Sequence, residues 1–152
     1  MGLDMFLSKK TYVQRWEHIP KERQFSVSVK RGGKAYKPVQ PKRISYIVEE
    51  VAYWRKFNAL HGWFVDNCQD GRDKCQEAYV DRDQIEEILS ILKQVDAYHV
   101  LAEDLLPQRQ GFFFGSIEYD EWYFTQVKES IKIFEKLLEE ENSDEFYYHS
   151  SW

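Results

Sequence analysis

The sequence contains little cysteine and no long hydrophobic run, and each absence excludes a class of protein. Two cysteines, Cys68 and Cys75, are too few for a disulfide-stabilised scaffold and fit a reducing compartment. No apolar run approaches the roughly 18 residues that a membrane-spanning helix requires. The opening segment 1–7 lacks the basic and the long apolar region of a secretion signal. We therefore expect a soluble, intracellular protein without membrane contacts.

Catalytic and metal-binding motifs are missing as well. The sequence contains no Gly-x-Ser-x-Gly nucleophile elbow, no His-Glu-x-x-His helix and no P-loop with its Gly-Lys-Ser/Thr ending. Its 2 cysteines and 4 histidines match no zinc-binding spacing. We therefore expect no metal, no cofactor and no catalytic residue, which favours binding over turnover.

Aromatic residues, by contrast, are abundant. The chain of 152 residues, a length that suits one domain, contains 10 Phe, 10 Tyr and 5 Trp. Tyrosine and tryptophan combine an apolar body with a polar group, so they serve both stacking sites and subunit interfaces. We expect a homo-oligomer, a dimer or a dimer-based assembly, with Tyr147, Tyr148 and Trp152 close to the contact.

The net charge of −5 conceals an uneven distribution. Residues 9–43 contain eleven Lys and Arg and two acids, whereas residues 44–152 contain ten basic and twenty-three acidic side chains. The basic segment is either a solvated, partly loop-like region or a surface that holds phosphates, with Lys34 and Arg43 as candidate ligand contacts. A nucleic-acid polymer is not an expected partner, because the acidic remainder would repel it.

Hydrophobic periodicity predicts one α+β domain over 1–152, with three or four helices beside a small antiparallel sheet. We expect the N-terminal and C-terminal segments to pair within that sheet. The predicted strands are 2–7, 25–29, 78–80 and 146–152. Helices are predicted over about 43–66, after a capping Asp81, over about 97–105 and after a capping Ser116.

Several stretches carry a resemblance to known proteins. They are Met1-Gly-Leu-Asp-Met-Phe-Leu7, Ile47-Val-Glu-Glu-Val-Ala-Tyr-Trp-Arg-Lys56, Gly111-Phe-Phe-Phe-Gly-Ser116 with Tyr119-Asp120, and the tail Tyr147-Tyr-His-Ser-Ser-Trp152. Over nearly its whole length the chain resembles a group of small bacteriophage and prophage proteins with no established activity, which usually have Tyr at the position of Phe6. The resemblance implies a phage origin and expression in the cytoplasm of a bacterial host, and it implies no site residues.

A first candidate site lies on the helix predicted over 43–66. Trp54, Asn58 and His61 fall on the same face of that helix as Ile47 and Val51, so they are expected to point inward. A buried polar group is costly unless it finds a partner. These polar residues therefore either satisfy one another in the core or line a pocket, to which the neighbouring Arg55 would contribute.

A second candidate site is the loop that precedes the last helix. Its glycines allow close backbone approach, its phenylalanines offer stacking faces, and the start of a capped helix presents free N–H groups to an anion. The alternative is a hydrophobic loop that holds the last helix against the core. The candidate ligand contacts in this loop are Arg109, Phe112, Phe113, Phe114 and Ser116.

Aromatic faces combined with Arg, Lys and helix-start N–H groups suit a nucleotide or a nucleotide-derived molecule. Bacterial immune systems signal with such molecules, and phages encode small proteins that sequester them. The leading hypothesis is therefore a phage anti-defence protein that binds a cyclic nucleotide or an ADP-ribose-type signal without cleaving it. Two alternatives are a protein-interaction module that inhibits a host enzyme and a small hydrolase of these signals with His61 as general base.

Overall fold

The computed structural model describes residues 2–140 and 145–152, and the chain divides into two compact units. The first unit combines residues 1–9 with residues 50–152, and the second comprises residues 10–49. The second unit covers nearly the same residues as the basic segment that the charge distribution separates. Whether the chain folds as a single domain stays a prediction.

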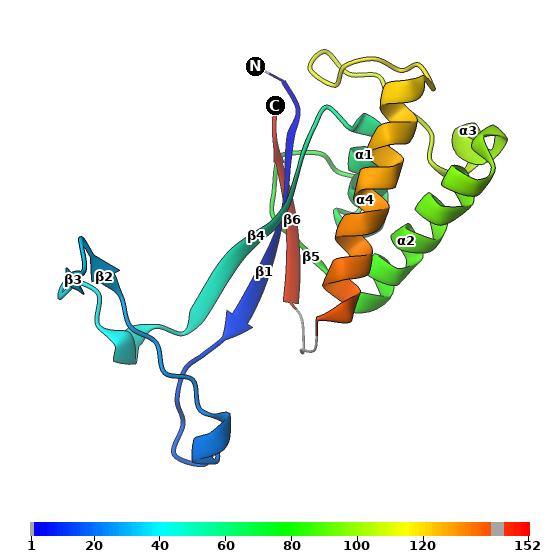
Figure 1. Ribbon diagram of the computed structural model, residues 1–152. Coiled ribbons are helices and arrows are strands. Elements are labelled where there is room, and N and C mark those ends of the chain that lie inside the picture. Colours follow the sequence, from blue (N-terminus) through cyan, green and yellow to red (C-terminus); the bar gives the residue numbers. More distant parts are fainter. Residues whose placement is uncertain (1, 141–144) are drawn as a thin grey trace. The chain divides into compact units, whose positions relative to one another are not determined.

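Four strands form one antiparallel sheet, and the helices of the first unit lie on one side of it (Figure 1). The strand order is β4 (Tyr46–Arg55), β1 (Asp4–Tyr12), β6 (Glu145–Ser151) and β5 (Ala78–Val80). The strands closest to the two chain ends are therefore neighbours at the centre of the sheet. The predicted α+β class and the predicted pairing of the terminal segments are confirmed.

Helices form the second layer of this unit. They are α1 (Asn58–Cys68), α2 (Arg82–Ala97), α3 (Ala102–Leu105) and α4 (Glu121–Glu139), with 3-10 turns at Lys21–Arg23, Pro41–Arg43 and His99–Leu101. Helices α2 and α4 each bury one stripe at helical spacing, which is why the apolar periodicity predicts them correctly. No helix in the described part of the chain is long and apolar enough to cross a membrane.

The pleat of the strands separates an inner from an outer face of the sheet, because successive side chains point to opposite sides. Met5 and Leu7 on β1, with Phe146 and Tyr148 on β6, face the helices and are completely buried. The alternate side chains form an outer aromatic row. It comprises Phe6, Tyr53, Tyr79, Tyr147 and His149. Phe6 contacts Tyr53 and His149, and Tyr79 contacts Tyr147.

The position of Tyr148 corrects one detail of the expected subunit contact. Its ring stacks on Phe64 with a centroid separation of 4.0 Å and is completely buried, so it cannot contact a partner subunit. Tyr147 is half-buried and Trp152 is 45% exposed, so both remain available at the surface. The oligomeric state itself stays a prediction.

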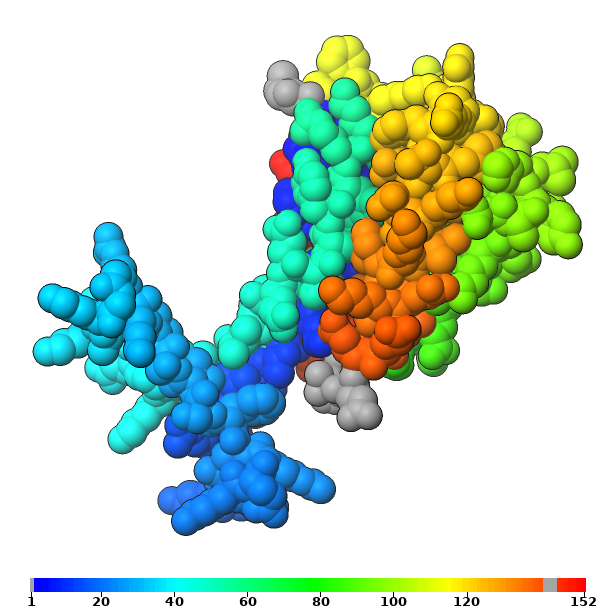
Figure 2. Space-filling view, viewed as in Figure 1, coloured from blue at the N-terminus to red at the C-terminus, as the bar shows by residue number. Residues whose placement is uncertain are grey.

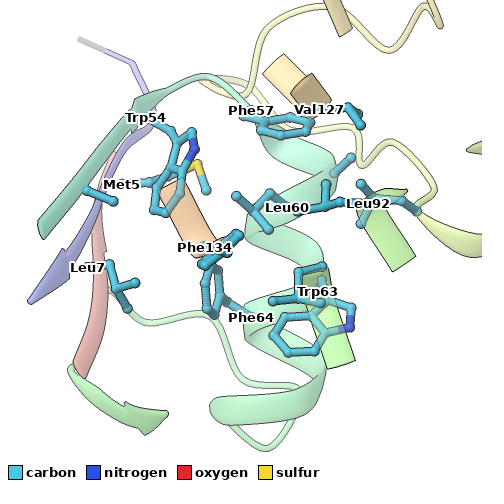
Figure 3. Close-up of a cluster of buried hydrophobic side chains, with 14 of the residues drawn as sticks. Met5, Leu7, Trp54, Phe57, Leu60, Trp63, Phe64, Leu92, Val127 and Phe134 are labelled. Carbon is cyan, nitrogen blue, oxygen red and sulfur yellow. The ribbon is translucent and has the colours of Figure 1, made fainter. Parts of the chain in front are cut away.

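Helix α1 lies at the centre of the hydrophobic core (Figure 3). Each of its residues from Asn58 to Val65 is buried. Met5 and Trp54 approach it from the sheet, Leu92 from α2, and Phe134 from α4 (Figure 3). Each large apolar side chain removed from water in this way stabilises the fold by roughly 1.5–3 kcal/mol.

The prediction of one helix over 43–66 is wrong. Residues 46–55 form strand β4, and helix α1 begins only at Asn58, after Lys56 adopts a positive φ of 58°. Tyr46-Ile-Val and Val51-Ala-Tyr-Trp are rich in β-branched and aromatic residues, which favour a strand when a neighbouring strand supplies hydrogen bonds. Of the residues at helical spacing, Trp54, Asn58 and His61 are buried, whereas Ile47 is 39% exposed, so the spacing does not mark one face of a single helix.

Two further local predictions are wrong. The alternating segment 25–29 forms no strand, because alternation produces a strand only where a second strand pairs with it. Ser116 does not cap the last helix: its hydroxyl accepts from the N–H of Glu118 at 3.1 Å in a local turn. Helix α4 is capped by Asp120, which accepts from the N–H of Tyr123 at 3.0 Å.

The second unit has little regular structure. Strands β2 (Lys30–Arg31) and β3 (Lys34–Ala35) form a short antiparallel hairpin around a Gly-Gly turn. The N–H of Val13 donates to the carbonyl of Ser45 at 2.8 Å and joins the beginning of the unit to its end. The residues between the two ends are largely exposed.

The capping box of helix α2 yields a stability prediction. The Asp81 carboxylate accepts from the N–H of Gln84 at 2.8 Å, and the Gln84 side chain accepts from the N–H of Asp81 at 3.0 Å. Asp81→Ala is expected to lower the free energy of unfolding by about 0.5–2 kcal/mol, measured by urea titration. Asp83→Ala is the matched control, because Asp83 lies in the same turn without capping it. Equal losses in the two variants would contradict the capping role.

Candidate ligand-binding site

Asn58 is completely buried at the start of helix α1, although its side chain is polar. Its amide nitrogen donates to the carbonyl oxygens of Phe114 and Ser116 at 3.0 and 2.9 Å. Its amide oxygen accepts from the backbone N–H of Arg109 at 2.8 Å. These three bonds hold the 109–116 loop against the start of α1. Asn58 therefore positions the loop and does not face a ligand.

His61, one turn further along α1, is also completely buried. Its Nδ1 lies 2.6 Å from the hydroxyl of Tyr148, and its Nε2 lies 2.8 Å from Oδ2 of Asp73. A neutral imidazole protonated at Nε2 donates to Asp73 and accepts from Tyr148, which satisfies both ring nitrogens. Burial lowers the pKa of His61, although the Asp73 carboxylate opposes this shift. His61 is therefore a core histidine without a free nitrogen for acid–base chemistry.

Trp54 and Phe114 contribute to the interior as well. The indole of Trp54 is 3% exposed and donates through Nε1 to the hydroxyl of Ser130 at 2.9 Å. The ring of Phe114 meets the ring of His61 edge-on with a centroid separation of 5.1 Å, and it packs against the core cluster. Trp54 is therefore too buried to stack on a ligand, and Phe114 packs the loop against α1.

Arg109 fastens the same loop to helix α1 by an ion pair with Asp66. Its side chain passes so close to Gly62 that a Cβ at this position would collide with it unless the Arg109 side chain moved. Phe112 is 95% exposed and meets the ring of Phe113 edge-on at 4.8 Å. Arg109 thus provides a second attachment of the loop to α1. Phe112 projects from the loop, whereas Phe113 is half-buried.

One pocket of the first unit does bring predicted site residues together. A cavity of about 410 Å³ lies between the end of β4, the end of the loop and the start of α4. In Figure 2 these segments, in green-cyan, yellow and orange, are adjacent near the top of this unit. We call this cavity the β4–α4 pocket. It is lined by Arg55, Lys56, Gly115, Ser116, Asp120 and Trp122.

The charges of the β4–α4 pocket are only partly neutralised. Arg55 pairs with Asp4 at 2.8 Å, and the Tyr53 hydroxyl donates to the same carboxylate at 2.5 Å, so the Tyr53 bond and Arg55 lower the pKa of Asp4. Lys56 is partly exposed and, among the described residues, has no ion-pair partner. The pocket therefore offers an uncommitted ammonium group beside an Arg–Asp pair.

The backbone around this pocket is unusual. Lys56 has a φ of 58°, a left-handed conformation that is rare for a residue with a side chain. Its stem passes over Gly115, which has a φ of 85°, so both residues occupy conformations that cost energy or require glycine. Such backbone strain is concentrated at ligand-binding and catalytic sites.

The basic candidates of the N-terminal segment lie elsewhere. Lys34 and Arg43 are exposed residues of the second unit, and the β4–α4 pocket is built without them. Lys9 is 5% exposed and pairs with Glu140 at 2.6 Å, which leaves it unavailable to a ligand.

The predicted ligand contacts did not include Lys56, Gly115, Asp120 or Trp122, although Lys56 belongs to the stretch of the first candidate site and Gly115 and Asp120 to the loop of the second. The sequence could have indicated Trp122, because this large aromatic residue lies beside the apolar stripe of α4 and not on it. In the structure it is 40% exposed. Asp120 carried another, as an N-cap residue one turn before that stripe begins. Lys56 follows Arg55 in the stretch of the first candidate site, but its place in the pocket depends on a backbone conformation that the sequence does not reveal.

Neither the Cys68 thiol nor the acidic residues that the structure describes supply a reactive nucleophile or a metal site. Burial, followed by the nearby acids Asp81 and Glu87, raises the pKa of the Cys68 thiol to about 12, so this cysteine is a poor nucleophile. Within residues 2–140 and 145–152, no cluster of three or more His, Cys, Asp and Glu side chains could hold a metal ion.

No protein-family model, curated protein or solved structure matches the chain. A function is therefore inferred from the β4–α4 pocket and its surroundings.

The bonds of Asn58 yield a second stability prediction. Asn58→Ala removes one partner from three loop groups, and it is expected to lower the free energy of unfolding by about 1–3 kcal/mol in a urea titration. Asn67→Ala is the matched control, because Asn67 is an exposed asparagine of α1 that bonds the carbonyl of Trp63 in its own helix. If the two variants are equally stable, Asn58 does not hold the loop.

The buried His61 predicts a pH dependence. Because the pKa of His61 is lowered in the folded state, the unfolded chain binds more protons near and below the ordinary value of 6.5, and stability falls as the pH is lowered through that value. His61→Gln, although less stable overall, should lose less unfolding free energy between pH 7.5 and pH 5.5 than the wild type. His18→Gln, which changes an exposed histidine, should keep the wild-type slope. Identical slopes in all three proteins would exclude His61 as the source.

Proposed function

We propose that the protein binds a nucleotide-derived signalling molecule in the β4–α4 pocket and sequesters it without cleavage. It would act as a phage anti-defence protein in the cytoplasm of the bacterial host. The observation that supports this proposal is the meeting of two cationic side chains, an exposed indole and a hydroxyl group in one cavity of about 410 Å³. A volume of this size suits a small ligand.

Each wall of the pocket suits one part of a nucleotide. Lys56 and Arg55 suit a phosphate group, and the 40% exposed ring of Trp122 suits stacking of a base. The Asp120 carboxylate caps α4 through Oδ1, so Oδ2 can accept a hydrogen bond from a ribose hydroxyl. The combination favours a nucleotide over free phosphate, which needs no stacking face, and over a purely apolar ligand, which needs no charge.

The charge of the surrounding unit favours a small ligand over a polymer. Residues 1–9 and 50–152 contain eleven basic and twenty-three acidic side chains, a net charge of −12. A long polyanion would be repelled by this surface, whereas a single nucleotide meets the two cations of the pocket and one carboxylate, that of Asp120.

The surroundings also favour binding over cleavage. Neither histidine nor cysteine lines the pocket, and His61 is buried behind the loop with both nitrogens bonded. The loop is already held by Asn58 and Arg109, so a ligand would order few groups on binding, which favours affinity.

The experiment incubates the purified protein with a panel of cyclic nucleotides and ADP-ribose derivatives, removes free ligand, denatures the protein by heat and analyses the supernatant. Sequestration predicts release of one intact nucleotide. Reaction products would instead identify a hydrolase of these signals.

Variants locate the binding to the pocket. Lys56→Gln removes the charge but keeps the length of the stem, and it is expected to weaken binding of the retained nucleotide by roughly 10-fold to 100-fold in calorimetry. Lys128→Gln is the matched control, since Lys128 is an exposed lysine of α4 outside the pocket. Unchanged affinity in Lys56→Gln, or equal losses in both variants, would remove the β4–α4 pocket from the proposal.

The outer aromatic row favours a second candidate function, a protein-interaction module that inhibits a host enzyme. Tyr53 and Tyr79 are 47% and 51% exposed on a sheet face that the helices do not cover, and tyrosine is enriched at protein interfaces. A panel from which no nucleotide is retained would favour this candidate.

A further inference from the structure

The second unit leaves most of its apolar side chains in water. All of its residues are described, and Val13 alone among them is buried. The exposed large apolar and aromatic side chains of this unit are Tyr12, Trp16, Phe25, Val39, Tyr46, Ile47 and Val48. Burying such a side chain is favourable by roughly 1.5–3 kcal/mol, and one of these seven, Phe25, lines a cavity that an apolar ligand could fill.

A cavity of about 540 Å³ lies within this unit. Its walls come from three segments. The N–H of Val13 donates to the carbonyl of Ser45 and joins the first segment to the third, in which a 3-10 turn shapes Pro41–Arg43. The apolar lining residues are Val13, Phe25, Val27, Pro41 and Ile44. A concave apolar site of this volume is the usual form of a small-molecule pocket.

Two cations complete the lining of this cavity. Arg15 and Lys42 are exposed, and neither has a hydrogen-bond or ion-pair partner among the residues that the structure describes. Neither Asp nor Glu lines the cavity, and residues 10–49 contain ten Lys and Arg against three acids, a net charge of +7. An anionic group beside the apolar walls would therefore be stabilised both locally and by the whole unit.

We infer that this cavity binds a small organic anion with an apolar body, held by its rings or chain against Phe25 and Val27 and by its charge at Arg15 and Lys42. The site shares no residue with the β4–α4 pocket and is independent of the function proposed for it. An apolar, concave lining suits a compact apolar body better than the hydroxyl-rich sugar of a nucleotide. It also suits a small molecule better than a membrane surface or a nucleic-acid strand, which would need a convex or extended surface.

Two fluorescent probes test the inference on the full chain. The dye 8-anilinonaphthalene-1-sulfonate has aromatic rings and one anionic group, and N-phenyl-1-naphthylamine has the same rings without the charge. We expect saturable binding of one sulfonate dye per chain, with the neutral dye bound about tenfold or more weakly, since one charge-assisted contact is worth roughly that factor. Equal affinities, or binding without saturation, would overturn the inference.

Variants separate this site from general dye adsorption. Arg15→Gln with Lys42→Gln should weaken binding of the sulfonate dye to the level of the neutral dye and leave the neutral dye unchanged. Lys30→Gln with Lys37→Gln is the matched control, because both are exposed lysines of the same unit outside the cavity, and it should leave both affinities within about twofold. If the two double variants weaken binding of the sulfonate dye equally, the dye responds to the net charge of the unit and not to this cavity, and the proposed site is wrong.

Two further measurements identify other occupants. Val27→Trp, which fills the cavity, should abolish binding of both dyes. If this variant does not fold, dye binding by the variant Arg15→Gln with Lys42→Gln still tests the site. Light scattering of Val27→Trp should give the wild-type mass; a lower mass would mean that a second copy occupies the cavity. Tighter binding of anionic phospholipid vesicles or of a single-stranded oligonucleotide than of the sulfonate dye, with both lost in the cation-pair variant, would likewise replace the small anion as the occupant.

Discussion

The enclosure of helix α1 is the constraint on which the rest of the first unit depends. Each residue from Asn58 to Val65 is buried, so the first two turns of the helix have no solvent-facing side on which to place polar groups. A buried polar group without a partner costs about 1–3 kcal/mol. The surrounding elements must therefore bring hydrogen-bonding groups to the helix. The positions of the 109–116 loop, of Asp73 and of the Tyr148 hydroxyl all follow from that requirement.

The same bonds explain how a surface pocket acquires a rigid wall. Asn58 donates to the carbonyls of Phe114 and Ser116 from inside the core. The N–H of Leu3, the residue before β1, donates to the carbonyl of Phe113 at 3.0 Å. These bonds hold residues 113–116 in one conformation before the chain reaches α4. Gly115 and Ser116 are then fixed opposite the end of β4, where Lys56 turns the chain from strand to helix. The hydrogen bonds of the buried Asn58 thus fix the position of the loop residues that line the β4–α4 pocket.

The two units differ in the interactions that stabilise them. The first buries a continuous aromatic and aliphatic core and carries most of the acidic residues. The second, residues 10–49, has many basic residues and few buried ones, so hydrophobic burial contributes little to holding it together. The second unit has a net charge of +7, and the repulsion between its cations disfavours its folded state. An anionic, apolar ligand would therefore stabilise this unit more than the first.

The sequence alone determined the features that depend on local pattern. The amphipathic stripes of α2 and α4, the Asp81 cap, the short strand at 78–80 and the separation of charge are all carried by neighbouring residues, and the structure contains each of them. The pairing of the two terminal segments could also be predicted, because each has an extended, apolar or aromatic composition that requires a partner.

Only the tertiary structure decided the rest. Residues 46–55 fit a helix or a strand by spacing, and pairing with β1 selects the strand because it satisfies the backbone hydrogen bonds there. Whether Asn58 and His61 face a ligand or the core depended on which groups lie opposite them, and those groups come from residues 12 to 87 positions away in the chain. The β4–α4 pocket joins Lys56 to Ser116 and Trp122, and no local pattern encodes such a meeting of distant segments.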